Sequence, residues 1–333
     1  MKPYAAYAIG AALVDTEIQV SDAELAAMNV EKGMMTLVDQ DRQREMLTQL
    51  SDHLIAASHA SGGSAGNSMI ATAMMGAPTY MSCKVAQDAD GDIYLADLEQ
   101  SGVAHGLTDR SSDGVTGKCI VLITPDAERS LNTHLGISET LSTDEVDEVA
   151  IKDSEWVYLE GYLVTSPTGH AAALKTKALA EQYGVRTAVS FSDPGMVKFF
   201  RDNMSAMVEG GVELVFCNES EALEWGKCDQ LDDAVAAIKQ VAKRFVITLG
   251  SDGALCWDGE TLHRVAAQPV EAVNTNGAGD MFAGAFLYAL SRGETDLRAT
   301  EFATLAAGEV VKYFGPRLDR DACLALRRQF FGD

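Results

Sequence analysis

The chain has 333 residues, 47% of them hydrophobic, so it can bury a large core and is long enough for one large α/β domain with an insertion, or for two domains. Lys and Arg number 26 against 49 Asp and Glu, a net charge of −23 without any basic block, which argues against nucleic acid or an anionic membrane as partner. The charge equally serves solubility, and it means that a bound polyphosphate needs local donors, a divalent metal or both.

The cysteines and the first apolar segment indicate a cytoplasmic protein. The six cysteines are scattered without a CxxC pair, and the six histidines form no HExxH motif, so reduced core cysteines are expected rather than disulfides or a zinc site. No stretch approaches the ~20 apolar residues of a membrane-spanning helix. Residues 4–14, "YAAYAIGAALV", are followed at once by Asp15 and Glu17, which favours a buried first strand over a signal peptide.

Strand-like and helix-like segments alternate along the chain. After the first strand, a helix is expected over 66–77 and another, starting near a proline and stopped by Gly184, over 167–184. Further strands are expected at 118–125, 155–163, 185–192, 212–218 and 244–250. This alternation predicts a mostly parallel sheet with helices on both faces, whose ligands bind beyond the carboxyl ends of the strands.

Two regions break the alternation. Residues 15–58 are charged and mixed, and residues 110–135 place two strand-like runs between turn-rich stretches. Neither fits another strand–helix–strand unit, so both are expected to form a small cover over the edge of the sheet. The predicted division is a large domain of residues 1–14, 59–110 and 136–333, with a small lid of residues 15–58 and 111–135.

The stretch "NTNGAGD" (274–280) precedes an apolar helical run that Gly293 ends. Asp280 therefore falls in the first turn of a helix, where unpaired N–H groups attract anions and glycines let a ligand approach the backbone. An ordinary loop with an aspartate cap explains the spacing equally well. The stretch is neither GxGxxG nor GxxxxGK[ST].

Three further stretches carry polar groups. "SGGSAGNS" (61–68) offers close backbone approach and Asn67, which suits a sugar hydroxyl or a helix cap. "NESE" (218–221) follows a strand, and its Asn218 and Glu221 suit either a hydrated Mg²⁺ or a capped helix. "TLGSDG" (248–253) suits a nucleotide backbone, although a β-turn accounts for it alone.

Together, in this order, the four stretches resemble the ribokinase-like PfkB family of sugar and nucleoside kinases, over nearly the whole chain. The resemblance implies a Rossmann-like α/β domain with a small β lid. Within the family, "TNGAGD", "GGS…NS" and the arginine-bearing "ERSLNTHLG" (128–136) are most similar to adenosine kinases. Asn274 stands where the family usually has an aspartate that supports a monovalent-cation site, so weak activation by K⁺, or none, is expected.

The resemblance also implies roles for individual residues in ATP-dependent phosphorylation of a ribose 5′-hydroxyl. Asp280 would be the base, Gly277, Ala278 and Gly279 the anion hole, and Arg129 the lid's contact with the transferring phosphoryl group. Asp15, Gly63 and Asn67 would hold the sugar, with Tyr162 as a stacking face for a base. Glu221 would organise Mg²⁺. The residues expected to border ATP are Asn218, Thr248, Gly250, Gly253 and Asn276.

Three functions stay open at this point. The first is a kinase acting on adenosine or a related nucleoside, and the second is a sugar kinase of the same family acting on ribose, fructose or a similar ligand. The third is a non-catalytic ligand-binding regulator, which would not need Asp280 and Glu221. The expected oligomeric state is a monomer or a homodimer.

Overall fold

A nine-stranded sheet forms the centre of the computed structural model, which describes residues 2–51, 58–107 and 110–333. The strand order is β14-β13-β12-β11-β10-β9-β1-β5-β6, and all neighbours are parallel except at β12–β13–β14. The strands are β1 (Tyr4–Ile9), β5 (Thr79–Ser82), β6 (Val103–Ala104), β9 (Ser154–Glu160), β10 (Arg186–Ser190), β11 (Val212–Asn218), β12 (Ala242–Thr248), β13 (Ala254–Trp257) and β14 (Leu262–Val265).

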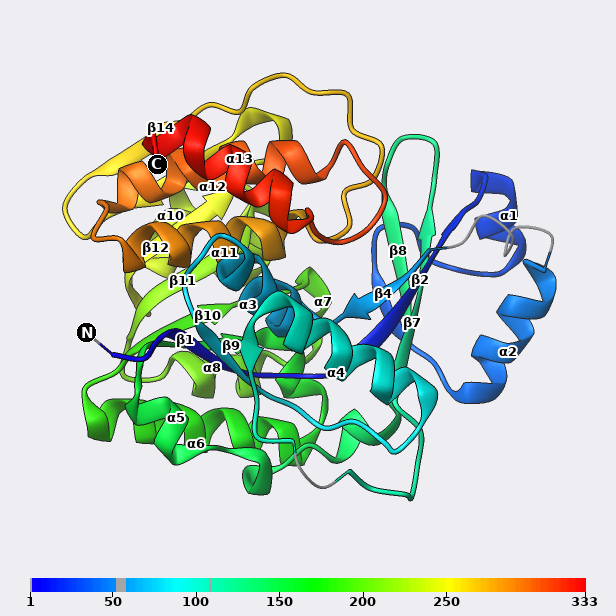
Figure 1. Ribbon diagram of the computed structural model, residues 1–333. Coiled ribbons are helices and arrows are strands. Elements are labelled where there is room, and N and C mark those ends of the chain that lie inside the picture. The colour runs from blue at the N-terminus through cyan, green and yellow to red at the C-terminus, as the bar shows by residue number, and fades with distance from the viewer. Residues whose placement is uncertain (1, 52–57, 108–109) are drawn as a thin grey trace.

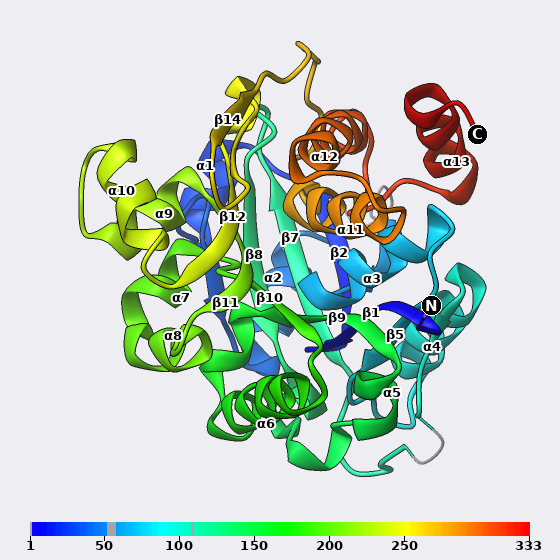
Figure 2. The ribbon, with the colours of Figure 1, turned by 90° about the vertical axis from the view of Figure 1, so that its left-hand side faces the viewer.

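Helices cover both faces of this sheet, as the alternation along the chain predicts (Figures 1 and 2). Along β9, Trp156 and Tyr158 enter one core while Val157 and Leu159 enter the other. The first core is closed by α3 (Ser64–Met74), α4 (Ala89–Ser101), α11 (Ala278–Ser291), α12 (Asp296–Val310) and α13 (Arg320–Phe331). The second is closed by α5 (Glu148–Lys152), α6 (Pro167–Tyr183), α7 (Pro194–Phe199), α8 (Arg201–Val208), α9 (Glu219–Gly226) and α10 (Leu231–Ile238).

A second sheet of five strands stands beside the large sheet, at the right in Figure 1. Its order is β3-β8-β7-β2-β4, from β2 (Leu13–Gln19), β3 (Met35–Leu37), β4 (Ser58–Gly62), β7 (Gly117–Ile123) and β8 (Arg129–His134). Along β2, Ile18 packs under α1 (Asp22–Ala27) and α2 (Gln40–Gln49), whereas Leu13, Asp15 and Glu17 point the other way, toward the large sheet. The period of two in a strand thus gives this sheet one apolar face and one face with carboxylates.

The predicted elements are largely confirmed, with differences at their ends. The first strand ends at Ile9, and the chain then enters the second sheet as β2. The strand expected over 155–163 ends at Glu160, because residues 161–165 form a 3₁₀ turn. The second sheet takes strands from both irregular regions and also residues 59–62, which were expected in the large domain. Residues 52–57 of the expected lid and 108–109 of the expected large domain lie outside the described residues.

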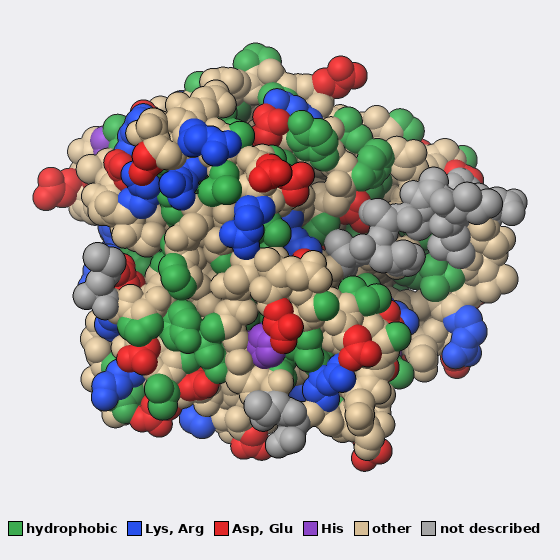
Figure 3. Space-filling view, viewed as in Figure 1, with side chains coloured by type: hydrophobic (Ala, Val, Ile, Leu, Met, Phe, Trp, Pro, Cys, Tyr) green, Lys and Arg blue, Asp and Glu red, His purple; other side chains and the backbone are tan. Residues whose placement is uncertain are grey.

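Two expectations about composition can be compared with the structure. The six cysteines are free thiols, and all but Cys228 are buried. Among the described residues, no helix has the length and apolarity needed to cross a membrane. On the face shown in Figure 3, acidic and basic side chains are intermingled.

Candidate active site

A cavity of about 470 Å³ lies between the second sheet and the carboxyl ends of β9 to β12. It brings together residues from motifs that are up to 265 positions apart in the chain, from Asp15 to Asp280. The predicted site residues that line it are Asp15, Gly63, Asn67, Arg129, Tyr162, Asn218, Glu221, Thr248, Gly250, Asn276, Gly277, Ala278, Gly279 and Asp280. Gly253 is the predicted site residue that does not line it.

The start of α11 is open toward this cavity. Gly277 is the N-cap residue, with φ 74° and no side-chain cap, and a Cβ at this position would lie 1.9 Å from the carbonyl oxygen of Pro316. Gly279 differs, because a Cβ there would meet no atom within 4 Å. Gly277 is therefore required by the fold. Gly279 is not required sterically, but without a side chain it leaves the backbone uncovered at the helix start, where N–H groups are unpaired and the potential is positive.

Asp280 is held against the start of α3. The two helices pack closely, since a Cβ on Gly284 of α11 would lie 2.6 Å from the Ser68 carbonyl oxygen of α3. Ser64 Oγ donates to Asp280 Oδ1 at 2.7 Å, and Asn67 Nδ2 donates to Oδ2 at 3.0 Å. Burial raises the pKa of Asp280 above its usual range, and these two hydrogen bonds oppose the shift. The carboxylate is thus held in one orientation, with both oxygens facing donors of α3.

Asn67 also contributes an unused acceptor. Its Oδ1 is buried and has no hydrogen-bond partner among the described residues. A buried acceptor without a partner costs free energy, so an oxygen in this position of a cavity wall is suited to accept from a ligand hydroxyl. Gly63, with φ 88°, turns the chain into α3 close to the Ala11 carbonyl oxygen and leaves Asn67 facing the cavity.

Asp15 lies across the cavity on β2, and its carboxylate is buried. A Cβ on Gly62 of the neighbouring strand would lie 2.0 Å from Asp15 Oδ1, so glycine is needed beside it. Burial, followed by the charges of Glu17 and Asp280, raises the pKa of Asp15 to about 7, against the opposing effects of Arg317 and of a hydrogen bond from Asn276. Asp15 is consequently a carboxylate whose charge depends on pH and on what fills the cavity.

Asn218 and Glu221 form a complete capping box at the start of α9. Asn218 Oδ1 accepts from Glu221 N at 2.8 Å, while Asn218 N and Nδ2 donate to the two carboxylate oxygens at 3.0 and 2.7 Å. Burial raises the pKa of Glu221 to about 7. The capping interpretation of this stretch therefore holds in the structure, and both residues also line the cavity.

Arg129 enters the cavity from the first position of β8. The described residues include no carboxylate within ion-pair distance of its guanidinium, although Asp193 and Asp280 are close enough to favour its charge. An arginine without a tight partner at the edge of a cavity, such as Arg129, is suited to bind an anion.

Tyr162 lies in the turn after β9 and donates from its hydroxyl to the Ser192 carbonyl oxygen at 3.2 Å.

Among the cavity residues to which the sequence prediction gave no role, three have functional side chains of particular interest. Ser64 is one residue beyond the glycine pair and holds Asp280. Glu160 ends β9, where its carboxylate accepts from Ala11 N at 2.8 Å and Ala65 N at 2.7 Å, and burial raises its pKa to about 7. Asp193 follows β10 and is buried. For Glu160 the sequence does contain a signal, because it is a single acidic residue at the end of an otherwise apolar strand, in "VYLEGY".

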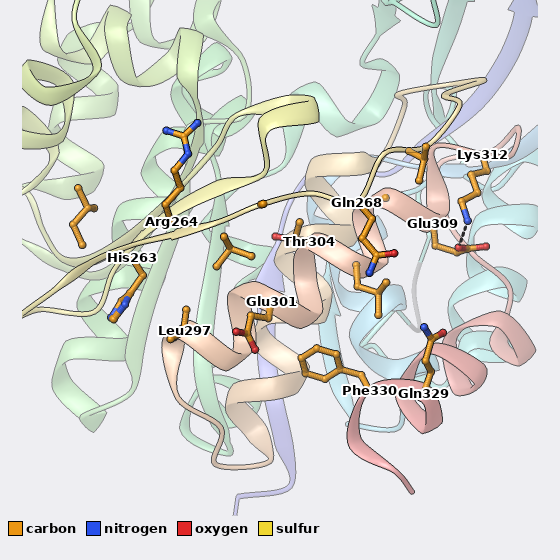
Figure 4. Close-up of a pocket in the computed structure, with 16 residues that line it drawn as sticks. His263, Arg264, Gln268, Leu297, Glu301, Thr304, Glu309, Lys312, Gln329 and Phe330 are labelled. Atoms are coloured by element: carbon orange, nitrogen blue, oxygen red, sulfur yellow. Dashed lines mark hydrogen bonds and ion pairs between the residues drawn. The ribbon is translucent and has the colours of Figure 1, made fainter.

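A second, larger hollow lies on the outer side of the β12–β13 turn. Gly253 packs there, and a Cβ on it would lie 1.9 Å from the Val265 carbonyl oxygen. Beyond Val265 a groove of about 840 Å³ runs between β14, residues 266–270, α12 and the end of α13 (Figure 4). Thr304 and Gln268 point toward it, but it contains none of the predicted catalytic residues, so the smaller cavity is the candidate active site.

Comparisons with known proteins show the family and the fold. The sequence profile of the pfkB family carbohydrate kinases matches residues 33–323. A probable sugar kinase from Rhizobium etli superposes with a TM-score of 0.94 at 30% identity over 99% of both chains. The adenosine kinase of Sinorhizobium meliloti superposes with a TM-score of 0.93 at 31% identity, over 98% of this chain and 99% of that one.

A curated relative gives the same result from sequence alone. The adenosine kinase of Saccharomyces cerevisiae is 26% identical over 330 residues, covering 92% of this chain and 95% of the yeast protein. The fold is therefore the ribokinase-like α/β fold, and the cavity between its two sheets is lined by the residues that the family resemblance singled out, except Gly253. The chain belongs to the pfkB family of carbohydrate kinases and is a phosphotransferase with an alcohol group as acceptor.

Proposed function

We propose that this kinase transfers the γ-phosphoryl group of ATP to the 5′-hydroxyl of adenosine or a closely related purine nucleoside. One observation carries the proposal: Asp280 is held at the open start of α11, in the same cavity as Asp15 and the unpaired oxygen of Asn67. This arrangement offers a base, an anion site and a sugar site within one enclosure. The similarity to the adenosine kinases of S. meliloti and yeast supports a nucleoside as acceptor.

The acceptor would be held through its ribose. Asp15 would accept from two ribose hydroxyls, which stabilises its charged form and offsets the burial that raises its pKa. Asn67 Oδ1 would gain the hydrogen bond that it lacks. Tyr162, which lines the same cavity with its hydroxyl tied to Ser192, would offer its ring to the nucleobase.

The transfer step needs positioning and charge neutralisation more than a strong base. Asp280 would accept the proton of the 5′-hydroxyl, with Ser64 and Asn67 fixing the direction of its two oxygens. The N–H groups at the start of α11, exposed beside Gly279, would face the negative charge of the migrating phosphoryl group. Arg129 would add a positive charge from the second sheet.

The family implies ATP with Mg²⁺, and the residues present fit that group. The described residues contain no cluster of three or more His, Cys, Asp or Glu side chains that would enclose a metal by themselves. Mg²⁺ usually keeps several waters and uses one or two carboxylates together with phosphate oxygens, where it neutralises charge. Glu221, whose two oxygens already accept from Asn218, would hold it through water.

We further propose that the nucleoside part of ATP extends from Thr248 and Gly250 toward the groove of Figure 4. The groove shares the wall at Val265 with Gly253 of the same turn. In α12, Gly308 lines the groove, and a Cβ on it would meet no atom within 4 Å. Gly308→Leu should therefore fold and raise KM for ATP about 5-fold or more while leaving KM for the acceptor unchanged; equal effects on both would contradict this placement.

The test of the proposed function is a substrate panel. Purified protein with ATP and Mg²⁺ is offered nucleosides, ribose and fructose, and ADP release is followed together with the phosphorylated product. Adenosine or another purine nucleoside should give the highest kcat/KM. A free sugar with a much higher value would establish the sugar-kinase alternative that the R. etli protein supports. Binding without any turnover would establish the non-catalytic regulator.

A further inference from the structure

Glu17 is a carboxylate of the second sheet that the proposed mechanism does not use. It lies on β2, two residues after Asp15 and on the same face, and only 4% of it is exposed. Its Oε1 accepts from Asn274 Nδ2 at 3.1 Å and from Asn276 Nδ2 at 2.9 Å. Its Oε2 accepts from the backbone N–H of Gly315 at 2.7 Å. One buried side chain thus joins β2 to two loops that lie far beyond it along the chain.

The partners of Glu17 lead directly to the anion site. Asn274 and Asn276 precede Gly277, the N-cap of α11. Gly315 precedes Pro316, whose carbonyl oxygen leaves no room for a Cβ on Gly277. The carboxylate therefore ties the loop that contains Gly277 to the loop that packs against it. Asn276 also lies near enough to Asp15 to lower the pKa of that carboxyl, so the residue that binds Glu17 also borders the sugar side of the cavity.

The hydrogen bonds define which atoms must be acceptors. Asn274 Oδ1 accepts from the backbone N–H of Asn276 at 2.9 Å, and this bond turns Asn274 Nδ2 toward Glu17. Glu17 then faces three N–H donors and offers only acceptors, as an ionised carboxylate does. A glutamine in its place would turn an NH₂ group toward at least one of these donors. An aspartate in place of Asn274 would instead set two carboxylates against each other.

We propose that Glu17 is a positioning residue for phosphoryl transfer: it fixes the 274–277 loop, and with it the start of α11, to the strand that carries Asp15. A second contact holds the same loop to the second sheet, since the Ala127 carbonyl oxygen accepts from Thr275 Oγ1 at 2.9 Å. Glu17 acts through Asn274, Asn276 and Gly315 and touches no reacting atom. The proposal rests on the proposed function, because it assigns the phosphoryl group to the start of α11.

The test begins with Glu17→Gln, which keeps the shape and removes one acceptor. Misplacement of a catalytic group by about 1 Å costs about 10²-fold in rate, so kcat should fall about 10- to 100-fold while KM for the acceptor changes less than about 3-fold. Hydrogen exchange of the peptide spanning 274–281 should become faster. Asp88→Asn is the matched control, because Asp88 also accepts from three donors, on Thr116 and Gly91, but lies outside the cavity.

The double variant Glu17→Gln with Asn274→Asp exchanges the acid and the amide. The amide introduced by the first substitution can then donate to the carboxylate introduced by the second, whose other oxygen still accepts from the Asn276 N–H. The exchange is incomplete, because Asn276 Nδ2 donates to the same Glu17 oxygen as Asn274 Nδ2 and would face the new amide nitrogen. We therefore expect partial recovery, with kcat of the double variant above that of either single variant. If Glu17→Gln does not fold, recovery of folding and turnover in the double variant supports the proposal, and failure of both overturns it.

The two proposals fail in different ways. Wild-type protein that phosphorylates no nucleoside contradicts the proposed function, and Glu17 is then judged with the acceptor that is turned over and by hydrogen exchange, which needs no turnover. A kcat of Glu17→Gln within about 2-fold of wild type, with unchanged exchange over 274–281, overturns the positioning role. A loss of stability in Glu17→Gln equal to that in Asp88→Asn, without a selective loss of kcat, overturns it as well.

Discussion

Two helices, α9 and α11, begin at the edge of the same cavity, and both carry an acidic residue at their third position. At α9 the acidic residue, Glu221, hydrogen-bonds to the cap residue Asn218 through its side chain and its backbone N–H. At α11 the cap residue is Gly277, without a side chain, and the acid, Asp280, is held instead by Ser64 and Asn67 of another helix.

The difference shows which helix start is available to a ligand. A capping box satisfies two of the N–H groups that an anion would otherwise use and puts a carboxylate beside the others, so the start of α9 is the less favourable one for direct phosphate binding. The start of α11 has no such cap, and its second residue, Gly279, leaves space above the backbone. A glycine at the N-cap position stabilises a helix less than a residue with a capping side chain. At α11 the glycine leaves the N–H groups free that the proposed reaction needs.

Gly279→Val should produce the largest loss among the variants that separate the two helix starts. Its Cβ has free space, so the protein should fold, but the branched side chain would occupy the anion site beside Asp280. Removing one preorganised donor of this kind costs about 10²- to 10³-fold in kcat. Ser220→Val, at the same helix position of α9, should lose less than about 5-fold. Equal losses in the two variants would erase the distinction between the helix starts.

Glu221→Gln tests what the closed helix start contributes. Glutamine can still accept from Asn218 N and so complete a capping box, but its NH₂ group would face Asn218 Nδ2, so the protein should fold with a moderately lower melting temperature. If Glu221 organises Mg²⁺ through water, the Mg²⁺ concentration for half-maximal activity should rise about 10-fold. Titration of MgCl₂ at saturating ATP and acceptor measures it. An unchanged Mg²⁺ requirement would make Glu221 a capping residue only.

Asp15→Asn tests the raised pKa of Asp15, the carboxyl group that lines the cavity at the start of α11. Because the folded-state pKa of Asp15 is raised to about 7, the folded protein holds a proton that the unfolded chain releases near pH 4. The stability from this proton is present at low pH and is lost as pH rises through about 7. Without ligand, Asp15→Asn should therefore be more stable than wild type at pH 8, by a larger margin than at pH 5, in thermal melts. The opposite trend would contradict the raised pKa.

Exchange of K⁺ for Na⁺ should have the smallest effect, changing kcat less than about 2-fold. Asn274 places an amide against Glu17, so the charge of this carboxylate is already met by N–H donors. A large rise of activity in K⁺, measured at constant ionic strength, would show that a cation site operates beside the α11 start despite Asn274.

The fold could be predicted from the sequence because its signals are local. Apolar runs bounded by glycine and proline indicated most strands of the large sheet, and Gly184, with φ 63°, ends α6 as expected. The second sheet could not be derived in the same way. Its strands β2 and β7 are parallel neighbours more than 100 residues apart, and β3 has three residues, so no local pattern specifies their pairing.

The site was predicted through motifs, and its remaining residues depend on contacts across the chain. Ser64 holds Asp280 only because α3 and α11 pack at Gly284. Glu17 belongs to a charged, irregular region of the sequence, yet it is buried against Asn274 and Asn276. The placement of Gly253 behind the cavity likewise follows from its packing on Val265, which the sequence does not reveal.

The central claim is that Asp280 performs the chemistry at the open helix start, and kcat of Asp280→Asn tests it most directly. Asparagine keeps the size of the side chain and is itself a good capping residue, so circular dichroism should show a folded protein. Loss of a general base should lower kcat about 10²- to 10⁴-fold, with a much smaller change in acceptor KM, because the proposal assigns the sugar to Asp15 and Asn67. Turnover within a few-fold of wild type would contradict the account and leave Asp280 with a structural role alone.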